Sequence, residues 1–150
     1  GFGNGIIFAS GTIAAANEDY GVAPFNASDC TPNIQYGLQV ADLGGSDVLG
    51  GAVVQSPRFP IGLNEDRVVL AGSTGTDIGL ARVEGDPLLP GFRDVDTSFG
   101  TGGKTVVPTG GSETVTAVAR QSNGSLIVTP TTSPRSTTWP ASPPPTRICA

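Results

Sequence analysis

Short apolar runs separated by turn signals dominate the pattern of this sequence. Apolar and polar residues alternate over residues 114–120, and a short apolar run follows at residues 126–129. Similar runs occur earlier, at residues 68–72 and 79–83. Alternation between turn pairs such as NG, GS, GT and GG is typical of β-strands. The pattern therefore predicts an all-β protein built of short strands joined by tight turns.

The same pattern recurs along the chain. NGIIFASG at residues 4–11 aligns with EDRVVLAG at residues 65–72 and with NGSLIVTP at residues 123–130. DYGVAPFN also aligns with DIGLARVE, and GGSDVLGGAVVQS aligns with GGSETVTAVARQS. The period is about sixty residues, which is long enough for four short strands and their turns. Four-stranded sheets stacked around an axis form a β-propeller, so the repeat predicts antiparallel four-stranded blades.

The repeat divides the chain into four parts. Residues 1–63 form a degenerate repeat unit with a loop insertion, PRFPIGLN, and residues 64–122 form the best-matching unit. Residues 123–130 begin a third unit, and residues 131–150 form a tail rich in Pro, Ser and Thr. We therefore expect an incomplete propeller-like array of about two and a half units.

Two neighbouring stretches carry a family resemblance. NEDRVVLAGSTGTDIGLARVE, followed by DVDTSFGTGGKTVV, resembles the bacterial delta-60 repeat, whose units typically read DGKIVVAG, then DFALARY, then LDTSFGTGGKV. The resemblance is specific over residues 65–128 and partial over residues 4–55, where NIQYGLQ replaces SFGTGGK. It implies a propeller-forming repeat of secreted or cell-surface bacterial proteins.

The resemblance also marks residues with a structural role. It implies that Phe99 plugs between sheets, and that Arg82 makes a structural ion pair, with an acid on the next blade, in preference to a ligand contact. The glycines of the SFGTGGK turn would lead the chain into the next blade. The positions with such a role are Gly5, Gly72, Asp77, Leu80, Ala81, Arg82, Asp96, Phe99, Gly100, Gly102, Gly103 and Gly124.

SFGTGGKT at residues 98–105 also ends like a phosphate-binding loop, with Gly103, Lys104 and Thr105 in matching places. Such a loop needs a glycine where Ser98 stands and a helix directly after it, so that the helix N-terminus faces the anion. Pro108 and the glycines after it exclude a helix there. We therefore expect a repeat turn instead of a phosphate site.

Three side chains form a weak candidate metal site. Asp94, Asp96 and Ser98 have the alternate spacing of a calcium loop, and hard cations prefer such oxygen ligands. However, the sharp turn of that loop needs Gly where Phe99 stands, and no bidentate acid follows at its far end. An Asp-rich turn that closes a hairpin is the favoured interpretation.

Composition narrows the chemistry further. The formal net charge is −5 and the pI is about 4.4, whereas nucleic-acid binding needs clustered Lys and Arg. No run of about 18 apolar residues occurs, so the sequence predicts no membrane span. Histidine is absent, which excludes His-based nucleophile pairs and His-ligated metals, and we predict no cofactor. Cys30 and Cys149 could pair, and the sequence leaves this open.

The tail departs from the repeat. After Val128 the repeat predicts a D-x-x-L-A-R strand, but the chain continues TPTTSPRSTTWPASPPPTRICA. One interpretation is a disordered Pro/Ser/Thr-rich tail. The other is translation out of frame, because TTWP read one base earlier can encode Asp-Asp-Leu-Ala, which is close to the expected strand. The second interpretation predicts that the strand beside residues 126–129 is missing, with an unpaired sheet edge and poor solubility.

The favoured function is a non-enzymatic structural or binding module. The chain would be a fragment of a secreted or cell-surface bacterial propeller protein, which packs against neighbouring repeats and presents loops to a protein or glycan. The alternative is part of a propeller-fold hydrolase or lyase whose active site lies at the ring's central channel, outside this fragment. No nucleophile with a base occurs in the sequence, which favours the non-enzymatic class.

Overall fold

Ten β-strands make up the computed structural model, which describes residues 6–14, 16–33, 37–55, 67–84, 95–132 and 146–148. These residues contain no helix, and hence none long and apolar enough to cross a membrane. The all-β class predicted from the sequence is confirmed. The strands are β1 (Ile6–Ala14), β2 (Glu18–Asn26), β3 (Gln39–Ala41), β4 (Asp47–Gln55), β5 (Arg67–Thr74), β6 (Asp77–Glu84), β7 (Lys104–Val107), β8 (Glu113–Arg120), β9 (Leu126–Thr132) and β10 (Thr146–Ile148).

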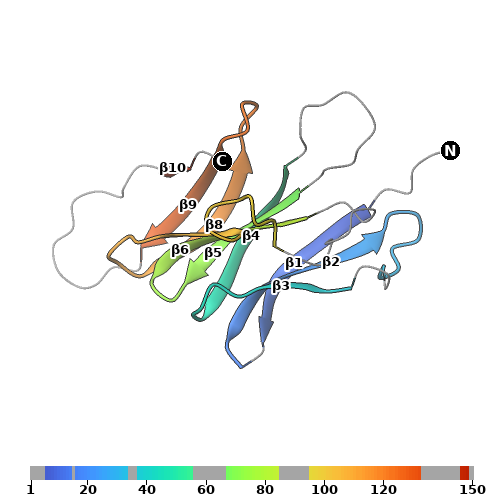
Figure 1. Cartoon of the computed structure of the whole chain (residues 1–150), viewed down its shortest axis with the longest axis horizontal. Helices are drawn as coiled ribbons and strands as arrows, with labels where there is room; N and C mark the ends of the chain where they lie inside the picture. The colour runs from blue at the N-terminus through green and yellow to red at the C-terminus, as the bar shows by residue number, and fades with distance from the viewer. Residues whose placement is uncertain are drawn as a thin grey trace.

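The strands form three antiparallel sheets that follow one another along the chain (Figure 1). β1, β2 and β3 make the first sheet, β4 to β7 make the second, and β8, β9 and β10 make the third. Within each sheet, every strand pairs with the next strand of the chain. β4 pairs with β5 of the second sheet, although its sequence belongs to the repeat unit of residues 1–63. The described residues do not close these sheets into a ring.

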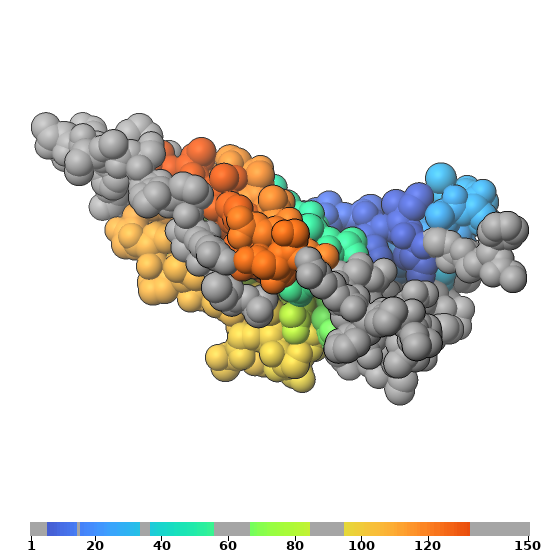
Figure 2. Space-filling view, turned by 90° about the horizontal axis from the view of Figure 1, so that it is seen from above, coloured from blue at the N-terminus to red at the C-terminus, as the bar shows by residue number. Residues whose placement is uncertain are grey.

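The second sheet is covered on both faces. Val68 of β5 packs in a cluster with Tyr20 of the first sheet, whereas the neighbouring Val69 packs in a cluster with Val128 of the third. Successive strand residues point to opposite faces, so β5 is buried at all six of its central positions. Full burial of such a side chain contributes about 1.5–3 kcal/mol. The second sheet therefore lies between the other two, which occupy opposite ends of the molecule (Figure 2). Burial on both faces also explains why the sequence of β5 is a continuous apolar run at residues 68–71.

A buried tyrosine joins the first sheet to the second. Tyr20 is fully buried, and its hydroxyl donates to the backbone oxygens of Ser73 at 3.2 Å and Gly79 at 3.3 Å. A Cβ atom at Gly72 or Gly79 would lie 2.8 Å from this hydroxyl, which leaves no room for a side chain at either position. Burial, and secondly the charge of Asp47, raise the pKa of Tyr20, so its hydroxyl stays protonated and donates. Glycine in these two strands thus permits a close approach between the sheets.

Residues aligned by the sequence repeat occupy equivalent places in successive sheets. Gly11 lies opposite Gly21 in the first sheet, as Gly72 lies opposite Gly79 in the second. The pairing of β4 with β5 shifts between Leu49 and Gly51, and the pairing of β8 with β9 shifts at the aligned positions Val115 and Ala117. A β-bulge is a specific local feature. Its recurrence means that the repeat extends to the details of strand pairing.

The third sheet includes a strand that the out-of-frame interpretation of the tail predicts to be missing. β9 continues to Thr132, and Thr146–Ile148 pair with it as β10. Val128 faces Thr146, as the equivalent Leu70 faces Ala81 in the second sheet. Backbone hydrogen bonding alone suffices for such a pair, because a ladder needs no particular side chains. β10 therefore occupies the place in which the repeat predicts its third strand.

Candidate functional site

The SFGTGGK stretch forms the turn between β6 and β7. Asp96 N donates to Arg82 O at 2.8 Å, and Arg82 N donates to Gly103 O at 3.0 Å, so both ends of the turn are attached to β6. Gly100, Gly102 and Gly103 have positive φ angles of 54°, 62° and 88°, which favour glycine. A strand, β7, follows directly. Because a strand takes the place of the helix that a phosphate-binding loop requires, the turn does not have the geometry of such a loop.

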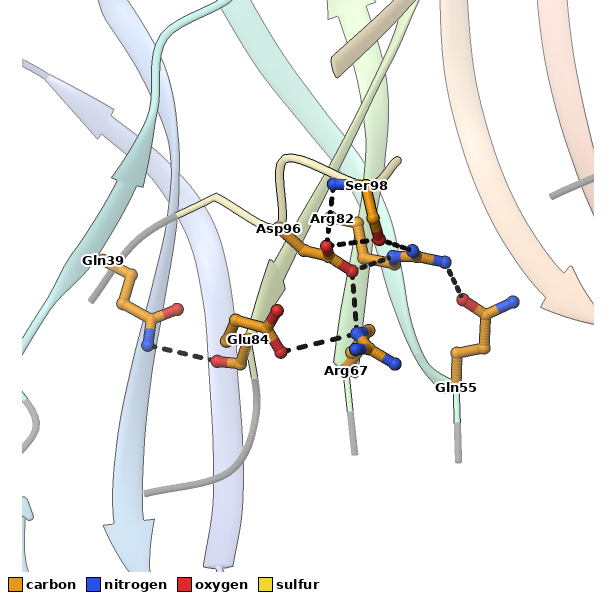
Figure 3. A network of polar contacts seen from close by, with 7 residues as sticks. All are labelled: Gln39, Gln55, Arg67, Arg82, Glu84, Asp96 and Ser98. Carbon is orange, nitrogen blue, oxygen red and sulfur yellow. Dashed lines mark hydrogen bonds and ion pairs between the residues drawn. The ribbon is translucent and has the colours of Figure 1, made fainter. Parts of the chain in front are cut away.

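Asp96 is the acceptor at the centre of a polar network (Figure 3). Its Oδ1 accepts from Ser98 N at 3.0 Å and from Ser98 Oγ at 2.6 Å. Its Oδ2 accepts from Arg82 Nε at 2.7 Å. Arg67 Nε also lies 2.7 Å from Oδ2, as an ion pair whose N–H is not aligned for a hydrogen bond. Burial opposes ionisation of Asp96, but the Ser98 hydrogen bonds and the two guanidinium groups outweigh it and hold the pKa of this carboxyl below its ordinary value.

These contacts bear on the candidate metal site of Asp94, Asp96 and Ser98, because they occupy the oxygens that would bind a cation. Both oxygens of Asp96 are engaged by protein donors, and Ser98 Oγ accepts from Arg82 at 3.0 Å. A cation here would meet two guanidinium groups, which repel it. Asp94, the third candidate ligand, lies outside the described residues. The turn is thus an Asp-rich turn held by arginine.

Arg82 connects three segments through one side chain. Its Nε donates to Asp96, Nη1 donates to Gln55 Oε1 at 2.9 Å, and the guanidinium carbon lies 4.9 Å from the centre of the Phe99 ring. The sequence analysis placed its acidic partner on the next blade. The structure instead places that acid in the turn after the same strand, because the turn folds back along β6.

The network continues into both neighbouring sheets. Gln55 Nε2 donates to Gly124 O of the β8–β9 turn at 3.5 Å. On the other side Arg67 lies 3.4 Å from Glu84, whose backbone oxygen accepts from Gln39 Nε2 of the first sheet at 3.4 Å. Sequence reasoning did not identify these partners of Arg82 and Asp96. The only available signal was the QS ending that 44–56 shares with its aligned copy.

The first repeat unit lacks the arginine and the aspartate together. Asn33 N donates to Pro24 O at 2.9 Å, in the way that Asp96 N donates to Arg82 O in the second unit. Proline thus stands in the place of Arg82, and asparagine in the place of Asp96. A half-buried guanidinium without its carboxylate would carry an unpaired charge. Loss of both partners avoids that cost.

The remaining positions marked by the resemblance lie in the core or in turns. Phe99 is 5% exposed and packs with Leu80 and Val115 in the cluster between the second and third sheets, and Ala81 is fully buried in the cluster toward the first. Asp77 Oδ1 accepts from Thr109 N at 3.2 Å. Gly124 has a φ of 89° in the β8–β9 turn, and Gly5 lies outside the described residues, as does Cys149, the possible partner of the exposed Cys30.

Comparison of the chain with protein-family models, curated proteins and solved structures gives no match. The delta-60 resemblance therefore stays a prediction from the residues. The polar groups of the network bind one another: Ser98 Oγ donates to Asp96 Oδ1 at 2.6 Å, and Arg82 binds both of these residues (Figure 3). This arrangement can hold sheets together, because its contacts reach from the first sheet to the third.

Proposed function

We propose that this chain is a non-enzymatic segment of a β-propeller-like repeat array, of the secreted or cell-surface bacterial kind that its repeats resemble. In this role the stacked sheets form a scaffold, and the loops between strands contact a protein or a glycan. The observation that carries the proposal is the polar network that runs from Gln39 in the first sheet to Gly124 in the third. Arg82 and Asp96, which belong to the repeat signature, take part in contacts that join sheets, as expected in a scaffold.

An uncovered sheet face supports the same proposal. Ile7 of β1 and Val68 of β5 occupy equivalent places, four residues before the aligned glycines Gly11 and Gly72. Val68 is 1% exposed because the first sheet covers it, whereas Ile7 is 47% exposed. Phe25 lies opposite Ile7, as Val83 lies opposite Val68. We infer that the outer face of the first sheet receives a further sheet of the same kind.

The test is sedimentation velocity on the whole chain over a range of concentrations. A sheet face that lacks its neighbour should associate with another copy, so the sedimentation coefficient should rise with concentration. Ile7→Lys should suppress this rise, because the charge would be buried on association. Val106→Lys is the matched control, since Val106 is similarly exposed, at 44%, but lies on β7 of the second sheet, away from the outer face of the first.

A monomer at all concentrations, or equal effects of the two variants, would contradict the array. The same preparations also test whether the chain itself carries a polysaccharide-cleaving site, whereas the alternative with an active site outside these residues needs a longer chain. We expect polysaccharide panels to remain intact after incubation with the chain. Release of shorter oligosaccharides, detected by mass spectrometry, would support an enzyme instead.

A further inference from the structure

Three aspartates converge where the first sheet meets the second. Asp19 lies on β2, Asp42 directly follows β3, and Asp47 begins β4. One carboxylate oxygen of each lies within 4.8 Å of the others. Asp47 is 0% exposed and Asp19 is 7% exposed, whereas Asp42 is open to solvent. We call these three residues the aspartate cluster.

Two buried oxygens of the aspartate cluster have no donor. Asp47 Oδ2 accepts from Leu43 N at 2.6 Å, but Asp47 Oδ1 and Asp19 Oδ1 have no hydrogen-bond partner. Within the described residues, the ion pairs belong to the arginines of the network and none reaches this cluster. A buried carboxylate oxygen without a partner costs free energy unless a cation or a proton compensates it. These two oxygens are therefore suited to a cation or a proton as a partner.

The charges of the aspartate cluster are only partly balanced. Lys104 Nζ donates to the backbone oxygen of Asp42 and brings one positive charge near three carboxylates. Burial and the charges of Asp42 and Asp47 raise the pKa of Asp19, against the opposite effect of Lys104. With all carboxylates ionised, a charge of about −2 is left, which one divalent cation neutralises.

We propose that Asp19, Asp42 and Asp47 bind one Ca²⁺ ion. Calcium takes oxygen ligands at about 2.3–2.6 Å, so two oxygens on opposite sides of the ion lie up to about 5 Å apart. The spread of the cluster, within 4.8 Å, suits that geometry. Magnesium, with ligands at about 2.0–2.1 Å, demands stricter octahedral order and gives up its water reluctantly, so calcium suits three carboxylates from separate segments better. Asp42 is exposed, which leaves room for water molecules as further ligands.

The backbone around the aspartate cluster is held by its own contacts. Ser46 Oγ donates to Glu18 Oε2 at 2.6 Å, and Asn17 Nδ2 donates to Gly45 O at 2.7 Å. Both bonds fasten the link 42–46 to the turn between β1 and β2. The ligands are thus positioned before any ion binds, and a bound ion would join the two sheets.

The next junction of the chain is a natural control. Its equivalent positions are Asp77, Pro108 and Glu113, so proline replaces the exposed aspartate. Asp77 Oδ1 accepts from Thr109 N at 3.2 Å. Two acids with a proline between them do not supply the three carboxylates that the first junction has. Substitution of Asp77 should leave calcium binding unchanged.

The experiment is calorimetric titration of CaCl2 into the whole chain after removal of divalent ions with a chelator, with thermal unfolding in parallel. We expect one saturable site with a Kd of roughly 0.1–1 mM, the range of extracellular calcium modules. Asp42→Asn should weaken binding at least about tenfold, because it removes one charged ligand. Asn keeps the oxygen that accepts from Gly44 N at 2.6 Å, so the fold is retained.

Asp77→Asn should bind Ca²⁺ like the wild type, and the melting temperature should rise with CaCl2 only where the aspartate cluster is intact. Absence of saturable heat and of a melting shift at about 10 mM CaCl2, roughly ten times the weakest expected Kd, would overturn the proposal. So would an equal response to MgCl2 at the same ionic strength, or equal loss of binding in the two variants.

Discussion

Replacement of Asp96 by asparagine should destabilise the chain through two arginines that lose their counter-charge. The Asp96 side chain is 4% exposed and that of Arg82 is 13% exposed, with Arg67 Nε also 2.7 Å from Oδ2. Asn keeps an oxygen for the Ser98 hydrogen bonds, so the change mainly removes charge. Loss of one partner of a buried ion pair costs about 3–5 kcal/mol, and partial exposure of Arg67 favours the lower end. We expect a loss of about 3 kcal/mol in the free energy of unfolding.

The assay is urea unfolding followed by far-UV circular dichroism, on Asp96→Asn, Arg82→Met and the double variant. The free energy of unfolding lost in the double variant should be smaller, by about 1–3 kcal/mol, than the sum of the losses in the two single variants. Asp29→Asn is the matched control, because Asp29 accepts from Thr31 N at 3.0 Å and Thr31 Oγ1 at 2.8 Å in an exposed turn without arginine. Its cost should stay below about 1 kcal/mol.

The wild type and Asp96→Asn also give a test of how stability depends on pH, with a defined sign. The pKa of Asp96 is lower in the folded chain than its ordinary value, so its stabilisation is present above about pH 4 and is lost as the pH falls through the folded-state pKa. The stability of the wild type and that of Asp96→Asn should therefore converge in acid. Equal stability losses in Asp96→Asn and Asp29→Asn at neutral pH, or strictly additive single effects, would refute the reasoning.

Two further substitutions test how the sheets are joined. Phe99→Ala should lower the free energy of unfolding by about 3–5 kcal/mol through loss of core packing, and Phe99→Leu should restore most of it, as measured by urea unfolding; equal losses in the two variants would show that ring volume is not what matters. Tyr20→Phe should cost about 1 kcal/mol because Ser73 O and Gly79 O lose a donor. The pKa of Tyr20 is raised in the folded chain, so the stability of the wild type should decline as the pH rises above about 10, where the unfolded tyrosine ionises. Tyr20→Phe should lack this part of the decline. An unchanged alkaline profile in this variant would contradict the placement of the hydroxyl.

Strand positions could be predicted from the sequence because their signals are local. The runs at residues 68–72, 79–83, 114–120 and 126–129 fall within β5, β6, β8 and β9. Each is set by period-two alternation or a short apolar run between turn residues. The sheet borders could not be predicted in this way. A repeat of fixed period aligns equally well wherever it is cut, and only the hydrogen-bonded partner of β4 assigns that strand to the second sheet.

The candidate sites likewise divide into contacts that are local in the sequence and contacts that depend on the fold. Asp96 and Ser98 stand two residues apart, so their turn was visible in the sequence, but the contacts of Gln55 and Arg67 depend on how strands lie side by side. The aspartate cluster was invisible, because Asp19, Asp42 and Asp47 belong to three segments that only strand pairing and the link between two sheets bring together. Sequence spacing carries no information about such a meeting. A site of this kind can be found only from the fold.

The two junctions of the second sheet rely on different chemistry. Toward the third sheet, Phe99 and the paired charges of Arg82 and Asp96 form contacts that are complete within the chain. Toward the first sheet, whose unit has lost that arginine and aspartate, Tyr20 packs beside the aspartate cluster. Like charges stabilise a junction only when a counter-ion or a proton joins them. If the cluster binds calcium as proposed, decay of the repeat signature in one unit has exchanged a junction that is complete in itself for one that the ions of the surroundings control.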